Sequence, residues 1–132
     1  MNSDLRIAKI LDGMSKTVMV SEIRTSEPSD SRGVMHYPEC CLYHHNRTPN
    51  SLVPDEIRQG CVDQPRTPCI TSSTAWNNRA LIVTARSYHS GGVNVNLGDG
   101  SVRFVSETIG LATWQALCTP QGAAGEVILS LF

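Results

Sequence analysis

The chain has 132 residues, a formal net charge of −1 and 17% charged residues, which suits one domain with one modest hydrophobic core. Because basic residues are not in excess, the composition gives no electrostatic support for binding nucleic acid. No run approaches the roughly 18 apolar residues of a membrane-spanning helix, and the amino terminus does not have the pattern of a secretory signal peptide. We therefore expect either a cytosolic protein or a piece of a longer, exported one.

The amino-terminal part predicts one short segment and one strand. Residues 4–11 suit a short helix or an extended lead-in, and Asp12-Gly13 marks a turn. Residues 17–23 alternate as a β-strand does, with apolar residues on both faces, so we expect a central strand of a sheet. Residues 25–32 are polar and predict a loop.

Residues 34–74 predict a long irregular insertion within a single domain, 1–132. The segment contains five prolines and lacks hydrophobic periodicity, with one short helical turn expected at 54–58. Loops of this length are unusual in a compact domain unless they are functional, disordered or cross-linked. Four of the five cysteines lie within thirty residues here, so in an exported protein we expect a loop stapled by disulfides among Cys40, Cys41, Cys61 and Cys69.

The pairing of these cysteines stays open, because four cysteines allow three pairings. A bond between adjacent Cys40 and Cys41 would strain the peptide that joins them. The simpler hypothesis pairs each of them with Cys61 or Cys69. Cys118 would then be the odd thiol, as a small buried core residue.

The carboxy-terminal part predicts a strand, a hairpin and a helix. Residues 80–85 form a short apolar run typical of a strand. Residues 109–117 predict a short helix that ends before Pro120. Residues 126–132 are apolar and could form a last strand or a tail.

The hairpin, residues 93–105, is the clearest local prediction. Its apolar residues alternate with asparagines, which is the period of a half-buried strand. The Asp99-Gly100 pair favours a tight primed turn, because such a turn needs positive φ angles that Asp tolerates and Gly adopts freely. Gly91-Gly92 at its start predicts a bulge or a close approach of two backbones.

His89 and Asp99 allow two interpretations. Asp99 could simply shape the turn of the hairpin. Alternatively, the nine residues between them could cross the hairpin and bring both side chains together as a ligand or metal pair, although two ligands are too few for a metal on their own.

A second candidate metal site lies between residues 36 and 45. Cys thiolates and His imidazoles are the ligands that zinc prefers, but the spacing is not that of a standard Cys-x2-Cys knuckle. In an exported protein we favour disulfides plus surface histidines as the explanation of the pattern, whereas zinc is the leading interpretation in a cytosolic one. We therefore expect no cofactor, with zinc as the alternative, held by His36, Cys40, Cys41, His44 and His45.

No pattern in the chain indicates catalysis. A nucleophile beside a base, a phosphate-binding loop and a dinucleotide fingerprint have no local signature here, so we expect a protein that is not an enzyme. Trp76 beside Asn77 resembles a carbohydrate site, in which a ring stacks on the sugar and an amide hydrogen-bonds to it. The alternative is a tryptophan in the core or at its rim.

Three segments resemble a known family. Residues 88–105, with His89, nine further residues and Asp99-Gly100, are similar to the His-x9-Asp-Gly signature of a pseudopilin-like family best known from planctomycete bacteria. Residues 11–22 resemble that family's strand entry. Residues 114–117 and 125–128 resemble its closing helix and Gly-Glu-Val tail. Members carry a prepilin-type leader, and their domain has no assigned function.

The resemblance implies an extracytoplasmic head on a pilin-like stalk, with an antiparallel sheet packed against a helix in an α+β fold. The hairpin and the strands at 17–23 and 80–85 would supply the sheet. Family members begin with a basic leader and a long apolar helix, and neither is found in this sequence. We expect a non-enzymatic structural or adhesive head of a surface filament or secretion pseudopilus. Its partners would be other pilin-like subunits or surface components, and it would reach the membrane only through the missing helix.

Overall fold

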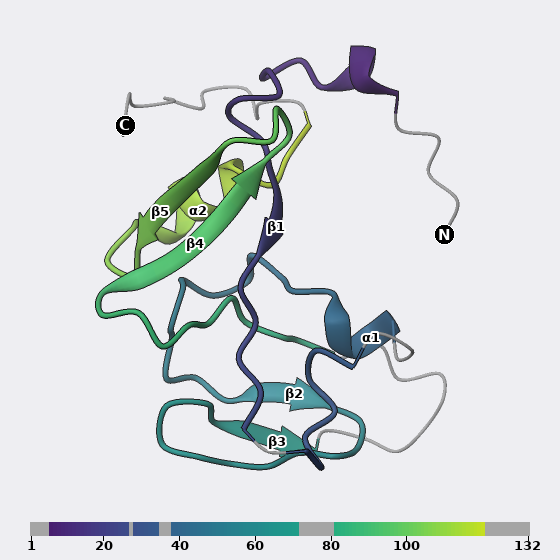
Figure 1. Cartoon of the computed structure of the whole chain (residues 1–132), viewed down its shortest axis with the longest axis vertical. Coiled ribbons are helices and arrows are strands. Elements are labelled where there is room, and N and C mark those ends of the chain that lie inside the picture. Colours follow the sequence, from purple (N-terminus) through teal and green to yellow (C-terminus); the bar gives the residue numbers. More distant parts are fainter. Residues whose placement is uncertain (1–5, 27, 35–37, 72–80, 121–132) are drawn as a thin grey trace.

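The computed structural model describes residues 6–26, 28–34, 38–71 and 81–120. Its strands form two sheets, an antiparallel one with the order β1-β4-β5 and a parallel pair of β2 with β3 (Figure 1). The combination of an antiparallel sheet with short helices confirms the predicted α+β class. The elements in chain order are the 3₁₀-helix η1 (Ile7–Lys9), β1 (Val18–Ser21), α1 (Pro38–Cys41), β2 (Asp55–Ile57), β3 (Cys69–Thr71), β4 (Gly92–Leu97), β5 (Val102–Ser106) and α2 (Leu111–Ala116).

The main core lies between the β4–β5 hairpin and α2. The apolar residues of β4 that alternate with its asparagines are all buried, as the pattern predicts. Trp114 of α2 is completely buried against them, and α2 lies behind the hairpin in Figure 1. The predicted hairpin and the predicted helix at 109–117 are both confirmed.

The turn of the hairpin differs from the prediction. Gly98, Asp99 and Gly100 form a three-residue loop, closed by hydrogen bonds from Leu97 N–H to the Ser101 carbonyl and from Gly100 N–H to the Leu97 carbonyl. In this loop the left-handed φ, +86°, belongs to Gly100 alone, so the turn is not a primed one. A three-residue loop of this kind needs one left-handed residue at its end, and Gly supplies it without strain.

Gly92 allows the two strands of the hairpin to approach closely, as predicted. A Cβ atom at this position would lie 2.1 Å from the Val105 carbonyl oxygen and 2.8 Å from Phe104 Cζ. Because no side chain tolerates such contacts, the start of β4 requires glycine.

β1 is an edge strand, so the prediction of a central strand is wrong. It pairs with β4, and among the described strands nothing pairs with its other edge. Val18 faces the core, whereas Met19 and Val20 are 51% and 59% exposed. The register with β4 shifts between Val18 and Val20, so Val18 is buried while the next two residues are both exposed.

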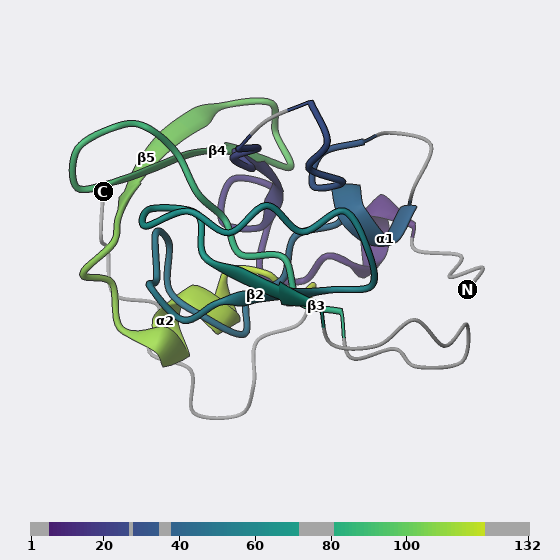
Figure 2. The ribbon, with the colours of Figure 1, turned by 90° about the horizontal axis from the view of Figure 1, so that it is seen from below.

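The segment 34–74 is more regular than predicted, because it contains α1 and the β2–β3 pair. Residues 55–57 form a strand instead of the expected helical turn. The predicted strand at 80–85 does not join the main sheet in its described part, 81–85. It makes isolated bridges instead, from Ile82 to Glu56 and from Thr84 to His44. Figure 2 shows the β2–β3 pair between α1 and α2 in this view.

One disulfide closes the end of this segment. Cys61 and Cys69 are joined by an S–S bond of 2.04 Å, so a stapled loop is confirmed. The expectation that Cys40 and Cys41 each pair with one of these two cysteines is wrong, because Cys61 and Cys69 are bonded to each other. Cys118 is exposed and not part of the core, contrary to the prediction. The thiol of Cys40 is buried, 3.5 Å from Ser31 Oγ.

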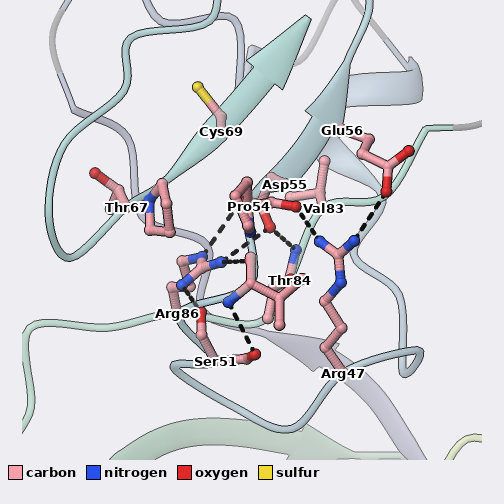
Figure 3. Close-up of polar contacts among 12 residues, drawn as sticks. Arg47, Ser51, Pro54, Asp55, Glu56, Thr67, Cys69, Val83, Thr84 and Arg86 are labelled. Carbon is pink, nitrogen blue, oxygen red and sulfur yellow. Dashed lines mark hydrogen bonds and ion pairs between the residues drawn. The ribbon is translucent and has the colours of Figure 1, made fainter. Parts of the chain in front are cut away.

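A buried network of charged side chains holds together the half of the molecule that contains the β2–β3 pair and the disulfide loop. Figure 3 shows two of its members, Asp55 and Arg86. The Asp55 carboxylate accepts hydrogen bonds from the guanidinium groups of Arg32, at 3.0 Å, and Arg86, at 3.2 Å. Asp30 accepts a second bond from Arg32, at 2.7 Å. All four side chains are at most 1% exposed where they pair, and their formal charges cancel. Buried charges are tolerated when they are paired and hydrogen-bonded in this way.

Arg32 also holds the disulfide loop in place. Its guanidinium donates to the carbonyl groups of Val62 and Thr67, which lie within the loop, close to its two ends. Burial alone would lower the pKa of Arg32, but the hydrogen bonds that its guanidinium donates to Asp30 and Asp55 raise the pKa above its ordinary value. The side chain therefore stays charged and fixes the loop against β2.

Asn50 connects this half of the molecule to the main sheet. Its side chain donates to the Gly92 carbonyl at 3.2 Å and accepts from the Ser87 amide at 2.9 Å. The residue has a φ of +56°, a conformation that asparagine tolerates better than most residues do. Arg86 N–H adds a further link, to the Glu22 carbonyl that follows β1.

We expect Gly92→Ala to destabilise the protein by about 1–3 kcal/mol, because the added methyl group has no room beside the Val105 carbonyl. Chemical unfolding measures the change. Gly110→Ala is the matched control, since a Cβ there lies no closer than 3.7 Å to Thr113 Oγ1. It should cost less than about 1 kcal/mol, and equal losses in the two variants would contradict the close approach.

Adjacent residues 55 and 56 test the buried network against an ordinary ion pair. Asp55→Asn leaves two buried guanidinium groups undercompensated, so it should cost about 3–5 kcal/mol of unfolding free energy. Glu56→Gln removes the partner of Arg47 from a pair whose side chains are 28% and 14% exposed, and should cost about 0–1 kcal/mol. Similar losses in the two variants, measured by chemical unfolding, would show that the network is not the stronger constraint.

Candidate functional site

The structure separates His89 from Asp99. His89 precedes β4 and Asp99 follows it, and a six-residue strand spans roughly 20 Å. The hypothesis that the two residues form a ligand or metal pair is therefore wrong. Asp99 shapes the turn, because its Oδ1 accepts hydrogen bonds from the amide and the hydroxyl of Ser101, at 2.9 and 2.7 Å. These hydrogen bonds lower the pKa of Asp99.

His89 contributes to the junction between β1 and β4. Its Nε2 lies 3.1 Å from Oε1 of Glu22, and the other oxygen of the same carboxylate accepts from the Asn94 amide at 2.7 Å. Glu22 follows β1 directly, so this one carboxylate ties the end of β1, the middle of β4 and His89 together. The imidazole is 53% exposed and makes a surface contact.

The glycines of the signature lie where the backbone requires glycine. Gly91 and Gly100 have left-handed φ angles of +83° and +86°, and Gly92 permits the close approach described above. The residues His89, Gly91, Gly92, Asp99 and Gly100 thus specify the hairpin and its attachment to β1.

The four described members of the predicted metal cluster do not gather around a common point. Within the described ranges, no group of three His, Cys, Asp or Glu side chains is placed to hold a metal ion. His44 Nδ1 accepts a hydrogen bond from the Val83 amide at 3.2 Å, and His45 is held in the core. His36, the fifth member, lies outside the described residues.

His45 is part of the packing around α2. Its ring stacks on Trp114, with 3.8 Å between centroids and 16° between planes. Nδ1–H donates to the Trp114 carbonyl, so in the neutral ring Nε2 accepts from the Tyr43 hydroxyl at 3.2 Å. Burial lowers the pKa of His45 and of its neighbour His44, and burial raises the pKa of Tyr43. All three groups are therefore held neutral.

Trp76 and Asn77, the candidate carbohydrate site, lie outside the described residues. The structure neither brings them together nor separates them.

A groove lies beside β1, between this strand and the segment that contains Leu42 and Tyr43. It has a volume of about 400 Å³. Two of its apolar side chains are strongly exposed, Met19 by 51% and Leu42 by 61%. It is lined by Val18–Ser21, Cys41, Leu42, Tyr43, His45 and Cys118.

Polar groups interrupt the apolar lining of this groove, among them Ser21, Tyr43, His45 and Cys118. Ser21 Oγ is buried without a hydrogen-bond partner within the described structure. The Cys118 residue is exposed, and its thiol donates to the Gln115 carbonyl at 3.0 Å. Partial burial of the thiol raises its pKa, which makes it a weak nucleophile. The groove therefore combines exposed apolar side chains with a few polar groups.

Sequence reasoning missed this groove, although one signal was present. The apolar residues on the second face of β1 were attributed to burial in the centre of a sheet. The opposite wall, Leu42 and Tyr43, belongs to a segment whose sequence carries no periodic pattern.

No helix in the described ranges is long and apolar enough to cross a membrane.

We expect the protein to lose stability as the pH falls below about 6.5. Folding lowers the pKa values of His44 and His45. At a pH between the pKa of the unfolded chain and the pKa of the folded protein, the unfolded chain therefore binds more protons, and a fall in pH favours unfolding. The stability that they contribute is complete above pH 6.5 and is lost as the pH falls toward the folded pKa. Chemical unfolding between pH 7.5 and 5.5 measures it, and His45→Phe should reduce the slope. Stability that is constant or rises toward pH 5.5 would contradict this account.

Comparison with known proteins identifies the family. A family model, SBP_bac_10, described as "Protein of unknown function (DUF1559)", matches residues 1–112. Searches of curated proteins and of solved structures gave no match. The matched range includes both sheets, the disulfide loop and all five signature residues. Because the match spans most of the sequence, this chain belongs to the DUF1559 family of proteins of unknown function.

Proposed function

We propose that the chain is an extracytoplasmic, pseudopilin-like head domain with a structural or adhesive role, and that it is not an enzyme. In this proposal it associates with other pilin-like subunits or surface components in a filament or secretion pseudopilus. The observation that carries the proposal is the exposed apolar face of the main sheet. The planctomycete-type resemblance of residues 88–105 supports the same assignment.

The outward face of the main sheet combines apolar and amide side chains. Register places Val20 beside Asn96 and Asn96 beside Val102, with Phe104 opposite Asn94 on the neighbouring pair. The three apolar residues are 59%, 64% and 51% exposed. An exposed apolar patch with polar groups around it is typical of a surface that binds another protein.

The disulfide supports an oxidising compartment. Structural disulfides form and persist outside the cytoplasm, where thiols are not kept reduced. The Cys61–Cys69 bond closes a loop that Arg32 holds from inside, so the bond and the buried network stabilise the same part of the fold. A head domain that is exposed at a cell surface benefits from such cross-linking.

Cell fractionation with thiol labelling in the organism that encodes the protein tests the location. We expect the protein outside the cytoplasm, with Cys61 and Cys69 protected from alkylation until a reductant is added. Recovery in the cytoplasm, with both cysteines alkylated without reductant, would contradict the proposal.

Chemical cross-linking in intact cells tests the assembly role. Val102→Asp places a charge on the outward face of the sheet and should lower the yield of cross-linked assemblies by several fold. Leu52→Asp is the matched control, because Leu52 is 72% exposed in a loop outside the sheet. Equal yields from the two variants would show that the sheet face is not the interface.

A further inference from the structure

We infer that two copies of this chain associate through the free edges of their β5 strands (Val102–Ser106), which run antiparallel and join the two main sheets into one. The inference goes beyond the proposed function, because it names a contact between identical chains and rests on the edge of the sheet instead of its outward face. It can be tested on the purified protein, whatever the compartment in which the chain works.

The backbone of β5 has one edge that faces away from the sheet. Within the described ranges only β4 pairs with β5 (Figure 1). Just beyond the last strand pair, Glu107 N–H donates to the Gly91 carbonyl at 2.8 Å. Hydrogen-bonded pairs alternate along an antiparallel ladder, so Ser106 and every second residue before it direct their backbone groups away from β4. The free edge therefore consists of the N–H and C=O groups of Val102, Phe104 and Ser106.

This edge is regular, unlike the opposite edge of the sheet. The register between β4 and β5 runs through five successive pairs without a shift, and β5 contains no proline. In β1 the register with β4 shifts between Val18 and Val20, and Val18 N–H already donates to the Leu117 carbonyl at 2.8 Å. Bulges and prolines keep edge strands from pairing with other chains. The edge of β5 is therefore the better template for an added strand.

The side chains on the inward face of this edge form a self-complementary pattern. Arg103 and Glu107 are exposed and flank Val105, which is 4% exposed. An antiparallel pairing centred on Val105 places each Arg103 opposite the Glu107 of the second copy. The same pairing places Phe104 opposite Ser106 of the second copy, so the free backbone groups of both strands can exchange hydrogen bonds. Opposite charges that face each other across two strands stabilise their pairing.

Charge also discriminates against other pairings. A pairing centred on Arg103 would set two guanidinium groups opposite each other, and one centred on Phe104 would set each Arg103 opposite a buried Val105. A charge on an edge strand keeps away chains that offer no matching acid. Glu107 can accept the new bond beside its present one, from Asn50 Nδ2 to Oε2 at 3.1 Å, because a carboxylate has several acceptor sites. The pattern therefore favours a second copy of this chain as the partner.

The pairing also brings exposed apolar side chains together on the outward face. Val102 and Phe104 are 64% and 51% exposed, and each would gain a neighbour from the second copy. Because one strand edge is a small interface, we expect a weak dimer that forms at high protein concentration.

Sedimentation velocity of the purified, disulfide-bonded chain over a range of concentrations tests the inference. We expect a dimer whose dissociation constant rises at least about tenfold in Arg103→Glu and in Glu107→Arg, because each change sets two like-charged pairs across the interface. The double variant should restore the dimer. Arg66→Glu, at an exposed position in the disulfide loop, is the matched control and should leave the dissociation constant unchanged.

An equimolar mixture of Arg103→Glu with Glu107→Arg provides a second test. Each chain in the mixture offers the charges that the other lacks, so we expect the two variants to associate with each other although neither associates with itself. Association in the mixture also shows that the losses in the single variants do not come from misfolding. In the wild-type protein, the Phe104 amide should exchange with solvent more slowly at high than at low protein concentration.

Three outcomes would overturn the inference. If the wild-type chain stays monomeric at every concentration, the edge of β5 does not pair. If the chain dimerises but charge reversal has no effect, or the double variant does not restore the dimer, a different surface forms the contact. If the Phe104 amide exchanges at the same rate in monomer and dimer, the added strand does not lie along β5.

Discussion

The half of the molecule that contains the β2–β3 pair and the disulfide loop depends on the hydrogen bonds and ion pairs of the Asp55 carboxylate. It receives the guanidinium groups of Arg32 and Arg86, and its Oδ1 accepts the Thr84 amide at 3.0 Å. Three segments that are distant in the sequence meet at this group. Because each charge is buried, removing any one of them leaves another without compensation. The network therefore constrains the disulfide loop, β2 and the segment before β4 at the same time.

This constraint extends to the sheet through neighbours of Arg86. The Arg86 amide bonds to Glu22, whose carboxylate also holds His89 and the Asn94 amide. The signature residues and the buried network thus form one continuous framework, which leaves the outward sheet face and the groove along β1 exposed. The exposed apolar surface is the basis of the assembly role that we propose for this DUF1559 domain.

Local patterns allowed the hairpin and α2 to be predicted, because alternation, the Asp99-Gly100 pair and Pro120 act over a few residues. The position of β1 could not be predicted, since apolar residues on both faces are compatible with a central strand and with an edge strand beside a groove. The buried network was missed because its members are 23 and 31 residues from Asp55 and look like ordinary loop charges. The prediction of the cysteine pairing was wrong for a similar reason. The spacing of the cysteines does not reveal that the pairing of β2 with β3 places Cys69 beside Asp55.

Native-state hydrogen exchange tests most directly whether the network joins the two halves into one cooperative unit. The amides to compare are Thr84, which bonds to Asp55, and Val95, in the centre of the main sheet. If the network acts as described, both amides exchange through the same global opening, with equal free energies and equal dependence on denaturant. Exchange of Thr84 through an opening that leaves Val95 protected would contradict this account, because the half that contains the β2–β3 pair would then unfold independently of the sheet.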